Sequence, residues 1–238
     1  MEFIAILVRK DNFMYLFFDQ EKAFCVDAYD PNLIEIALNK KLQHGKIYTN
    51  ESLQNEENLD KTRTLIYCLT THHHFDHSSG DSIIKEKYNP EMINYHTLKE
   101  NKLKIEENIK YYFTPCHTKD SVCFLIEDTY LLTGDTFFYL GVGKFFEGTG
   151  EDMKKNIVKI ITEVNEKVIL LYGHDYSKTN TLFAEKYLEI PDFLKKKVFL
   201  SLSEEKKYNP FFNYNELVSQ GKIKDMDDLR HKKDIFKP

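Results

Sequence analysis

The chain has 238 residues and a formal net charge of −5 at pH 7. Hydrophobic residues make up 42% of the sequence, which is enough to bury a core, so a disordered chain is not expected. Its 33 basic residues are outnumbered by 38 acidic ones, so nucleic acid is not expected as the main partner. The length suits one large domain or a main domain with a small appendage.

Isolated cysteines and the lack of long apolar runs bear on the compartment. Cys25, Cys68, Cys116 and Cys123 form no CxxC pair and are too few for a disulfide framework, so we expect small buried thiols in a reducing compartment. The N-terminal residues lack the features of a signal peptide, and no apolar run approaches the roughly 18 residues of a membrane span. These observations predict a soluble cytoplasmic protein with no membrane partner.

Three runs rich in β-forming residues open the chain, at residues 3–8, 13–18 and 23–26. Turn-forming and polar residues separate them, which predicts a meander of strands. Asp30 before Pro31 predicts the capped start of a helix, because proline is favoured where the first helical N–H has no partner. Residues 44–63 are polar and largely aperiodic, and we expect a surface loop or insertion there.

Four later apolar runs, each short enough for a buried strand, end in polar residues that do not belong in a core. The runs span residues 64–69, 109–113, 130–132 and 168–171, and the residues that follow them are His72, His74, Asp76 and His77, then His117, then Asp135, then His174. Strands are rigid and the loops after them can aim side chains, so functional residues gather at strand ends. The pattern therefore predicts a functional site built from these strand ends.

Helices are predicted between and after these strands. Asp81 can cap a helix that runs to Tyr88, and Thr149 with Asp152 three residues on has the pattern of a capping box. Beyond the last strand the sequence turns to short helical stretches rich in Lys and Glu. We therefore expect a domain boundary near residue 175.

The segment His72-x-His74-x-Asp76-His77 is dense in metal-binding side chains. Zinc prefers about four ligands and the strand ends offer more, which predicts two metal ions that share the donors. Imidazole and carboxylate without thiolate suit Zn, Fe or Mn alike. A structural zinc site is less favoured, because such sites are closed cages of four ligands that usually include cysteine. The histidines expected to lie outside the site are His44, His73, His96 and His231.

These motifs resemble the metallo-β-lactamase superfamily and, within it, the glyoxalase II family of hydroxyacylglutathione hydrolases. The segments that carry the resemblance are Thr71–His74, Thr114–Thr118, Leu132–Thr136, Gly143–Thr149, Tyr172–Tyr176 and Arg230–Lys237. The resemblance covers nearly the whole chain. It implies an α+β fold, with an αββα catalytic sandwich at residues 1–174 and a small helical substrate-binding domain at residues 175–238.

The resemblance also implies the metal ligands and the reaction. The first metal would be held by His72, His74 and His117, the second by Asp76, His77 and His174, and Asp135 would bridge the two. A hydroxide between two divalent ions, most readily zinc, would hydrolyse the thioester S-lactoylglutathione to D-lactate and glutathione. Asp76 and Asp135 would position this hydroxide. The reaction is the second step of methylglyoxal detoxification by the glyoxalase pathway.

The partner implied is a small glutathione thioester, and the chain would act as a monomer or a weak homo-oligomer. The residues implied in binding the substrate are Lys144, Phe146, His174, Tyr176, Arg230 and Lys233. Arg230 and Lys233 are three residues apart, so on a helix they share a face and can grip one carboxylate through charge-assisted hydrogen bonds. A thioester suits the predicted site, because it needs mainly a strong nucleophile and a cation beside the developing oxyanion.

Three departures from the family pattern stand out. Phe146 lies where many members carry tyrosine, so a hydroxyl contact to glutathione is lost or supplied elsewhere. The residues Ser79-Gly80-Asp81 stand where the family usually has Gly-Gly-Asn. The segment 44–63 is longer than the pattern requires.

Other enzymes of the same superfamily remain as alternatives, among them a persulfide dioxygenase with a single iron, a lactonase and a nuclease. A single iron would leave Asp76, His77 and His174 without a metal to bind. It would also leave the basic tail with Arg230 and Lys233 unexplained. The alternative that is not an enzyme is a binding or scaffold protein stabilised by a structural metal.

Overall fold

The computed structural model describes residues 1–100 and 108–238. The chain divides into two compact units, Met1–Lys104 and Ile105–Pro238. Each unit combines a sheet with helices, which confirms the predicted α+β class. The predicted boundary near residue 175 lies within the second unit and stays a prediction.

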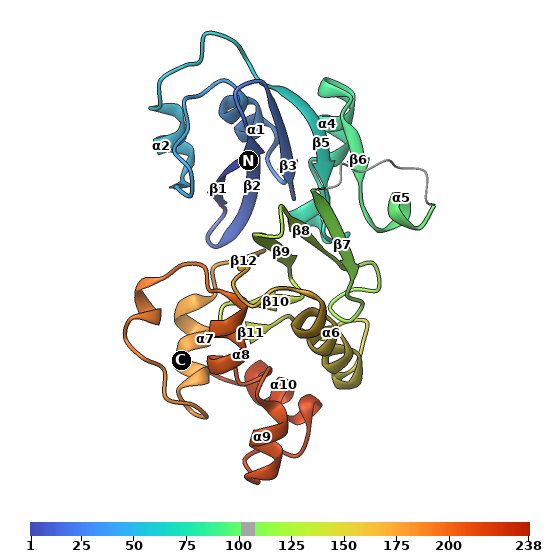
Figure 1. The fold of residues 1–238 in the computed structure, drawn as a ribbon, viewed down its shortest axis with the longest axis vertical. Coiled ribbons are helices and arrows are strands. Elements are labelled where there is room, and N and C mark those ends of the chain that lie inside the picture. Colours follow the sequence, from blue (N-terminus) through green and yellow to red (C-terminus); the bar gives the residue numbers. More distant parts are fainter. Residues whose placement is uncertain (101–107) are drawn as a thin grey trace. The chain divides into compact units, whose positions relative to one another are not determined.

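The first unit is built on a six-stranded sheet in the order β4-β1-β2-β3-β5-β6 (Figure 1). Its strands are β1 (Glu2–Val8), β2 (Asn12–Phe18), β3 (Lys22–Val26), β4 (Ile47–Tyr48), β5 (Thr64–Leu69) and β6 (Glu91–Ile93). The first three strands pair antiparallel, as predicted from the turn-forming residues between them. β5 runs parallel to β3 and to β6. Its C-terminal end therefore opens onto a loop, and this loop carries the predicted metal ligands of the first unit.

Helices cover one face of this sheet. They are α1 (Pro31–Leu38), α2 (Asn50–Gln54) and α4 (Asp81–Tyr88), with the single-turn α3 (Phe75–Ser78) and α5 (Tyr95–Lys99) at its edge. Apolar side chains of α1, α2 and α4 pack with those of β1, β2, β3 and β5 in one buried cluster. The opposite face of the sheet carries aromatic residues: the Phe24 ring is stacked 4.9 Å from that of Phe17. Both faces of the sheet are therefore buried.

The start of α1 confirms the prediction, because the Asp30 side chain accepts a hydrogen bond from the backbone N–H of Asn32. The prediction of a plain loop at residues 44–63 is wrong in part. Residues 47–48 form β4 beside β1, and a capping box of Thr49 and Ser52 starts α2. These elements are too short to show a period, and burial of Tyr48 and Leu53 in the core holds them in place.

The second unit has a four-stranded sheet in the order β12-β9-β8-β7. Its strands are β7 (Ile109–Phe113), β8 (Val122–Ile126), β9 (Tyr130–Gly134) and β12 (Ile169–Tyr172), and a separate hairpin joins β10 (Phe137–Phe138) to β11 (Gly141–Val142). β9 and β12 run parallel, so their C-terminal ends meet at one edge of the sheet. Asp135 and His174 follow these two ends.

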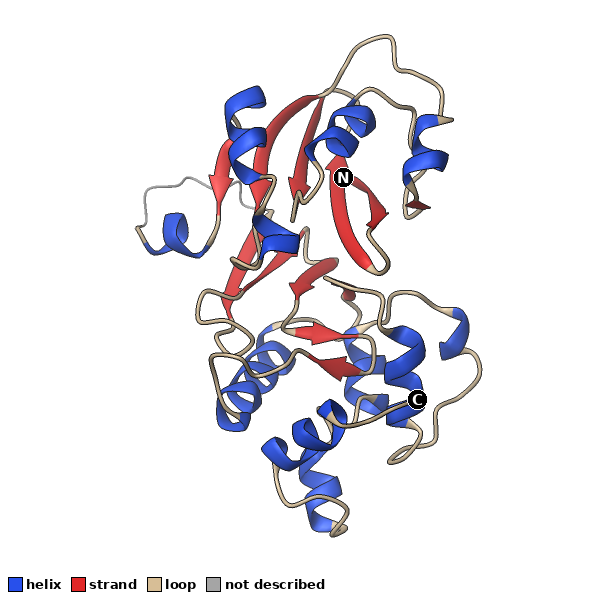
Figure 2. Cartoon of the chain, turned by 180° about the vertical axis from the view of Figure 1, so that it is seen from behind, coloured by secondary structure: helices blue, strands red, loops and turns tan. Residues whose placement is uncertain are grey.

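The helices of the second unit are α6 (Gly150–Glu163), α7 (Ser177–Ala184), the 3₁₀ turn η1 (Leu194–Lys196), α8 (Leu202–Tyr208), α9 (Tyr214–Ser219) and α10 (Met226–Asp234). They lie on both sides of the β10–β11 hairpin in Figure 2. The capping box predicted at the start of α6 is confirmed, since Thr149 and Asp152 exchange hydrogen bonds. Apolar residues of the tail helices share one buried cluster with those of the strands.

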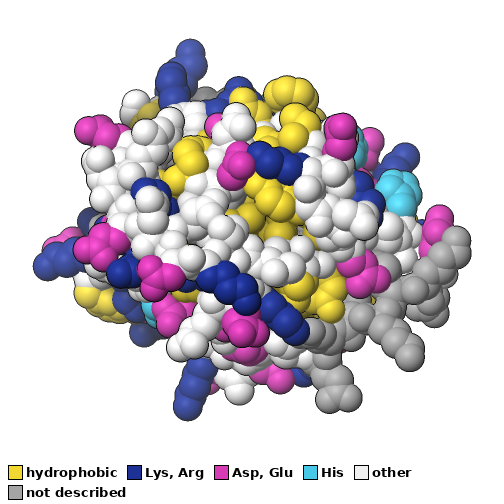
Figure 3. All heavy atoms as spheres, turned by 90° about the horizontal axis from the view of Figure 1, so that it is seen from above, with side chains coloured by type: hydrophobic (Ala, Val, Ile, Leu, Met, Phe, Trp, Pro, Cys, Tyr) yellow, Lys and Arg dark blue, Asp and Glu magenta, His cyan; other side chains and the backbone are white. Residues whose placement is uncertain are grey.

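The thiols and the surface agree with the composition of the chain. All four cysteines are free and buried, which confirms their reading as small buried hydrophobes. On the face drawn in Figure 3, acidic and basic side chains are interspersed, as suits a nearly balanced charge. Among the described residues, no helix is both long enough and apolar enough to span a membrane.

Asp81 does not cap α4 as predicted, since the cap position belongs to Gly80, which has no side chain to offer. A side chain at residue 80 is not tolerated, because its Cβ would lie 1.8 Å from the carbonyl oxygen of Ala28. The Asp81 carboxyl instead turns inward and accepts a hydrogen bond from Thr70 Oγ1 at 2.7 Å, with Cys68 Sγ 3.8 Å away. Burial raises the pKa of Asp81 to about 7, and the hydrogen bond from Thr70 opposes this rise.

The raised pKa of Asp81 predicts how the stability of the fold depends on pH. A folded-state pKa raised above its ordinary value means that the folded chain loses stability as the pH rises from about 4 through 7. Asp81→Asn should therefore flatten the fall in unfolding free energy between pH 5 and 8, by up to about 1.4 kcal/mol per pH unit. Urea unfolding measured across this range tests it, with Glu86→Gln on the exposed face of α4 as the control. An unchanged slope in Asp81→Asn would contradict the assignment.

Candidate metal centre

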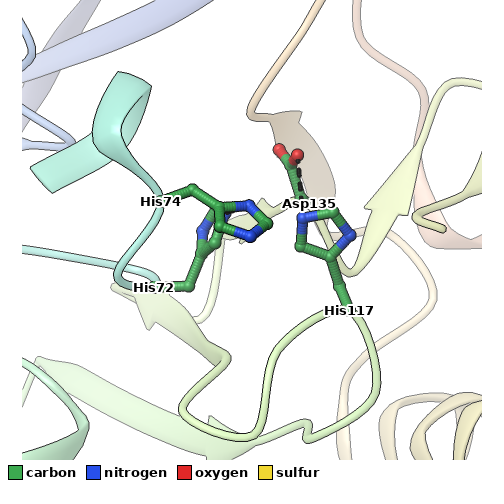
Figure 4. A group of neighbouring side chains, drawn as sticks. All are labelled: His72, His74, His117 and Asp135. Atoms are coloured by element: carbon green, nitrogen blue, oxygen red, sulfur yellow. Dashed lines mark hydrogen bonds and ion pairs between the residues drawn. The ribbon is translucent and has the colours of Figure 1, made fainter. Parts of the chain in front are cut away.

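The loop after β5 presents the predicted metal ligands of the first unit. His72 and His77 are buried, whereas His73 between the motif positions is exposed. His72 Nε2 lies 3.1 Å from His74 Nδ1, and the two side chains project from the turn before α3 in Figure 4. The Asp76 and His77 ligand atoms lie within 4.8 Å of each other. The spacing His-x-His-x-Asp-His thus gives two close pairs of donors.

A buried carboxylate behind this loop orients two of the rings. Asp27 at the end of β3 accepts hydrogen bonds from the backbone N–H of Thr71 at 2.7 Å and from Thr71 Oγ1 at 2.8 Å. Its Oδ2 lies 2.9 Å from His77 Nδ1. Thr71 Oγ1 in turn lies 3.0 Å from His72 Nδ1. The Nδ1–H tautomer of both rings satisfies these contacts and leaves Nε2 of His72 and of His77 for a metal.

The second unit presents Asp135 between two histidines. Asp135 Oδ2 lies 3.3 Å from His117 Nε2, the contact that is dashed in Figure 4, and Oδ1 lies 3.6 Å from His174 Nε2. All three side chains are buried. Each oxygen of one carboxylate therefore faces a different imidazole, which is the arrangement that a bridging ligand needs.

The backbone near Lys144 fixes the His117 ring. His117 Nδ1 lies 3.0 Å from the Lys144 carbonyl oxygen, so this ring also keeps Nε2 for a metal. Gly143 makes that approach possible, because a Cβ there would lie 1.8 Å from the Asp135 carbonyl oxygen and 3.0 Å from His117 Nδ1. The donor set is thus imidazole and carboxylate in both units, with Nε2 of three rings presented, and it fits zinc, iron or manganese.

Comparisons with known proteins identify the family. No family model matches the chain. A probable hydroxyacylglutathione hydrolase of Encephalitozoon cuniculi is 42% identical over 248 residues, covering 99% of this chain and 98% of its own length. The hydroxyacylglutathione hydrolase of Pelagibacter ubique is 34% identical over 84% of this chain and 82% of its own. The chain belongs to the hydroxyacylglutathione hydrolase family.

This family assignment makes the chain a hydrolase, and solved structures agree on the fold. ETHE1 from Myxococcus xanthus superposes with a TM-score of 0.62 at 18% identity, covering 99% of this chain and 91% of that one. A metallo-β-lactamase from Staphylococcus aureus gives 0.60 at 19% identity, covering 95% of this chain and 64% of that one. The predicted metallo-β-lactamase fold is confirmed.

Three of the predicted substrate residues lie beside predicted metal ligands of the second unit. The Phe146 ring meets that of His117 at 5.2 Å and lies 5.3 Å from Lys144 Nζ. The Tyr176 ring stacks on that of His174 at 5.0 Å. Phe146 and Tyr176 are both exposed, as contacts for a small molecule need to be.

The predicted basic pair lies on α10, but its two members differ. Arg230 already has partners, since its guanidinium donates to the Val142 carbonyl oxygen at 2.8 Å and pairs with Asp234 at 2.9 Å. Lys233 Nζ is buried, and in the described part of the chain it has no hydrogen-bond partner. It lies 5.1 Å from the centre of the Phe183 ring. Burial and then the charge of Arg230 lower the pKa of Lys233 to about 8.

Sequence reasoning missed Asp27 and Asn12, which hold the loop of the first unit. Asn12 at the start of β2 is fully buried and donates from Nδ2 to the Asp76 carbonyl oxygen at 2.7 Å. Asp27 has a backbone φ of +53°, a left-handed conformation that few residues other than glycine, asparagine and aspartate adopt readily. Neither this conformation nor these hydrogen bonds can be read from the sequence, which shows only a single aspartate after an apolar run.

We expect Asp27→Asn to weaken metal binding far more than folding. Asparagine keeps the size and tolerates the backbone conformation, but it cannot accept all the hydrogen bonds of Thr71 and His77. Loss of such a supporting partner typically costs 10–100-fold in metal affinity or activity. Competition with a chelator measures the affinity, and circular dichroism measures the fold. Equal metal affinity in variant and parent would show that Asp27 does not orient the ligands.

Proposed function

We propose that this hydrolase cleaves S-lactoylglutathione to D-lactate and glutathione, as the second step of methylglyoxal detoxification. The observation that carries the proposal is the 42% identity to a probable hydroxyacylglutathione hydrolase along almost its whole length. The residue pattern supports the same reaction, because the substrate contacts of the family have counterparts here, apart from Phe146 in place of tyrosine.

We propose that the chain binds two divalent metal ions, most readily zinc. The first ion would be held by His72, His74 and His117, the second by Asp76, His77 and His174, and Asp135 would serve both. The two carboxylate oxygens of Asp135, each facing a different histidine, support the bridging role. When bound, two such ions would supply a water that ionises near neutral pH and a positive charge beside the thioester carbonyl.

The side chains themselves have positioning roles in this proposal. Asp76 and Asp135 accept hydrogen bonds and fix the orientation of the attacking water, while Asp27 and the Lys144 carbonyl keep the imidazole rings in the ligating tautomer. The leaving group is a thiolate, which is weakly basic and leaves without a dedicated acid. No serine or cysteine nucleophile is required, which agrees with burial of all four thiols.

Substrate binding is assigned to Lys144, Phe146, His174, Tyr176, Arg230 and Lys233. Lys233 is the free cation of the basic pair in this proposal, and Arg230 supports it by tying α10 to Val142. The glycine carboxylate of glutathione would supply the partner that the buried ammonium lacks. Residues 175–238 then act as a substrate-binding segment, as the sequence predicts.

We also place the protein in the cytoplasm, as a monomer or weak homo-oligomer. Its four free thiols support a reducing compartment. A persulfide dioxygenase or a lactonase on the same fold is the alternative activity, and the number of donors argues against a single iron.

Two assays on the purified, metal-loaded protein separate these functions. Release of thiol from S-lactoylglutathione measures the proposed hydrolysis, and uptake of dioxygen with glutathione persulfide measures the dioxygenase reaction. We expect rapid thiol release and no dioxygen uptake. Dioxygen uptake without thioester hydrolysis would overturn the proposal.

Lys233 offers a second test, in which binding and stability move in opposite directions. Lys233→Met removes a buried, unpaired charge but keeps the stem, so the melting temperature should hold or rise. The KM for the glutathione thioester should rise roughly tenfold, because one charge-assisted hydrogen bond of about 1.5 to 3 kcal/mol is lost, while kcat changes little.

The controls for this test are a second substrate and a neighbouring lysine. A thioester that lacks the glycine carboxylate should be almost indifferent to Lys233→Met. Lys232→Met breaks an ion pair with Asp228 on the same helix and should leave both KM values unchanged. Equal KM values in parent and Lys233→Met would remove the carboxylate anchor from the account.

A further inference from the structure

The turn of the β10–β11 hairpin adopts a backbone conformation that costs free energy. Phe137 pairs with Val142 and Phe138 with Gly141, so the turn consists of Tyr139 and Leu140. Leu140 has a φ of +49°, in the left-handed region that disfavours a large side chain. A turn of this kind persists only where surrounding contacts hold it.

Side chains from the tail hold this turn through its backbone. The Tyr139 carbonyl oxygen accepts from Asn180 Nδ2 at 2.9 Å, and the Gly141 carbonyl oxygen accepts from Asn209 Nδ2 at 3.0 Å. Between them, the Leu140 N–H donates to Glu205 Oε1 at 3.0 Å. All three side chains are buried.

Glu205 is the central residue of these three side chains, Asn180, Glu205 and Asn209, which we call the clamp. Its Oε1 also accepts from Tyr172 Oη at 2.7 Å, and its Oε2 accepts from Asn209 Nδ2 at 2.7 Å. The carboxyl group is fully buried, and burial raises its pKa to about 7 while the three donors oppose this rise. None of the described residues forms an ion pair with it. Burying an acid without a cation beside it costs free energy, and an apolar residue of similar size would avoid this cost. The three donors need an acceptor, which an apolar residue could not supply.

The end of the hairpin opposite the turn leads into the candidate site. Asp135 and Thr136 precede β10, and Gly143 and Lys144 follow β11. The Gly143 N–H donates to the Thr136 carbonyl oxygen at 3.2 Å, which closes this end. The Lys144 carbonyl oxygen then meets His117 Nδ1. The chain of the hairpin thus connects the turn held by Glu205 to Asp135 at one end and to Lys144 at the other.

We propose that Glu205 is a positioning residue for the hydrolase: by fixing the Tyr139–Leu140 turn, it sets the places of Lys144 and of the His117 ring. This inference rests on the proposed function for its kinetic consequences. The clamp itself does not depend on the identity of the substrate.

Glu205→Gln is the sharpest variant, because glutamine keeps the volume and replaces one acceptor oxygen by an NH₂ donor. Every neighbour of the carboxylate is a donor, so the amide must place a donor against a donor. Glu204→Gln is the matched control. Glu204 is the next residue of α8, it accepts from the Ser201 N–H, and glutamine serves as well in that capping role.

Amide hydrogen exchange and steady-state kinetics, both measured well below the melting temperature, test the proposal. In Glu205→Gln we expect the amides of residues 137–144 to exchange at least tenfold faster than in the parent, while those of β8 and β9 are unchanged. We expect the KM for S-lactoylglutathione to rise about three- to tenfold. Glu204→Gln should behave as the parent in both measurements.

The outcomes separate this inference from the proposed function. Unchanged exchange in residues 137–144 overturns the positioning role, whatever the activity. Faster exchange with unchanged KM and kcat overturns it as well, because the clamp would then be structural only. A parent without thioesterase activity overturns the proposed function. The positioning role then stands if faster exchange comes with a lower metal affinity, and falls if the metal affinity is unchanged.

Discussion

A histidine that binds a metal through Nε2 must direct its Nδ1–H at an acceptor, and the structure meets this requirement for three of the predicted ligands. Asp27 meets it for His77, and through the hydroxyl of Thr71 for His72. The Lys144 carbonyl meets it for His117. These acceptors lie at the end of β3, on the loop after β5 and after β11. The imidazole rings are therefore oriented for metal binding only when these separate segments are folded correctly.

Strained backbone conformations and buried acids occur in both units. Asp27 and Leu140 both adopt left-handed conformations, and Gly143 lies where any side chain would strike the Asp135 backbone. Asp81 and Glu205 are buried acids whose pKa values are raised to about 7. Conformational strain and buried charge of this kind are expected near functional sites, where they are tolerated because surrounding contacts hold them.

The metal ligands could be predicted from the sequence because the pattern is local. His72 to His77 fall within one turn after a strand, and Asp135 and His174 end two strands that prove to be parallel neighbours. The strands that the sequence predicts are continuous apolar runs and are present in the structure, whereas β6, β8, β10 and β11 were not predicted. Asp27, Asn12 and Glu205 could not be found in this way, since each is a single polar residue far along the chain from the group it holds.

The errors have physical reasons as well. Asp81 has the residue type and position of a helix cap, but the close approach of Ala28 reserves the cap for glycine and turns the carboxyl inward. Residues 47–54 are polar overall, and only the burial of Tyr48 and Leu53 determines their structure. In both cases contacts distant in sequence override a local preference.

The central claim is that the histidines and aspartates serve two metal ions in one thioester hydrolase. Metal-free protein titrated with zinc tests it most directly, with S-lactoylglutathione hydrolysis and bound metal measured on the same samples. The account predicts that activity rises until two ions are bound per chain and is constant beyond that point. Full activity with one bound ion would contradict it.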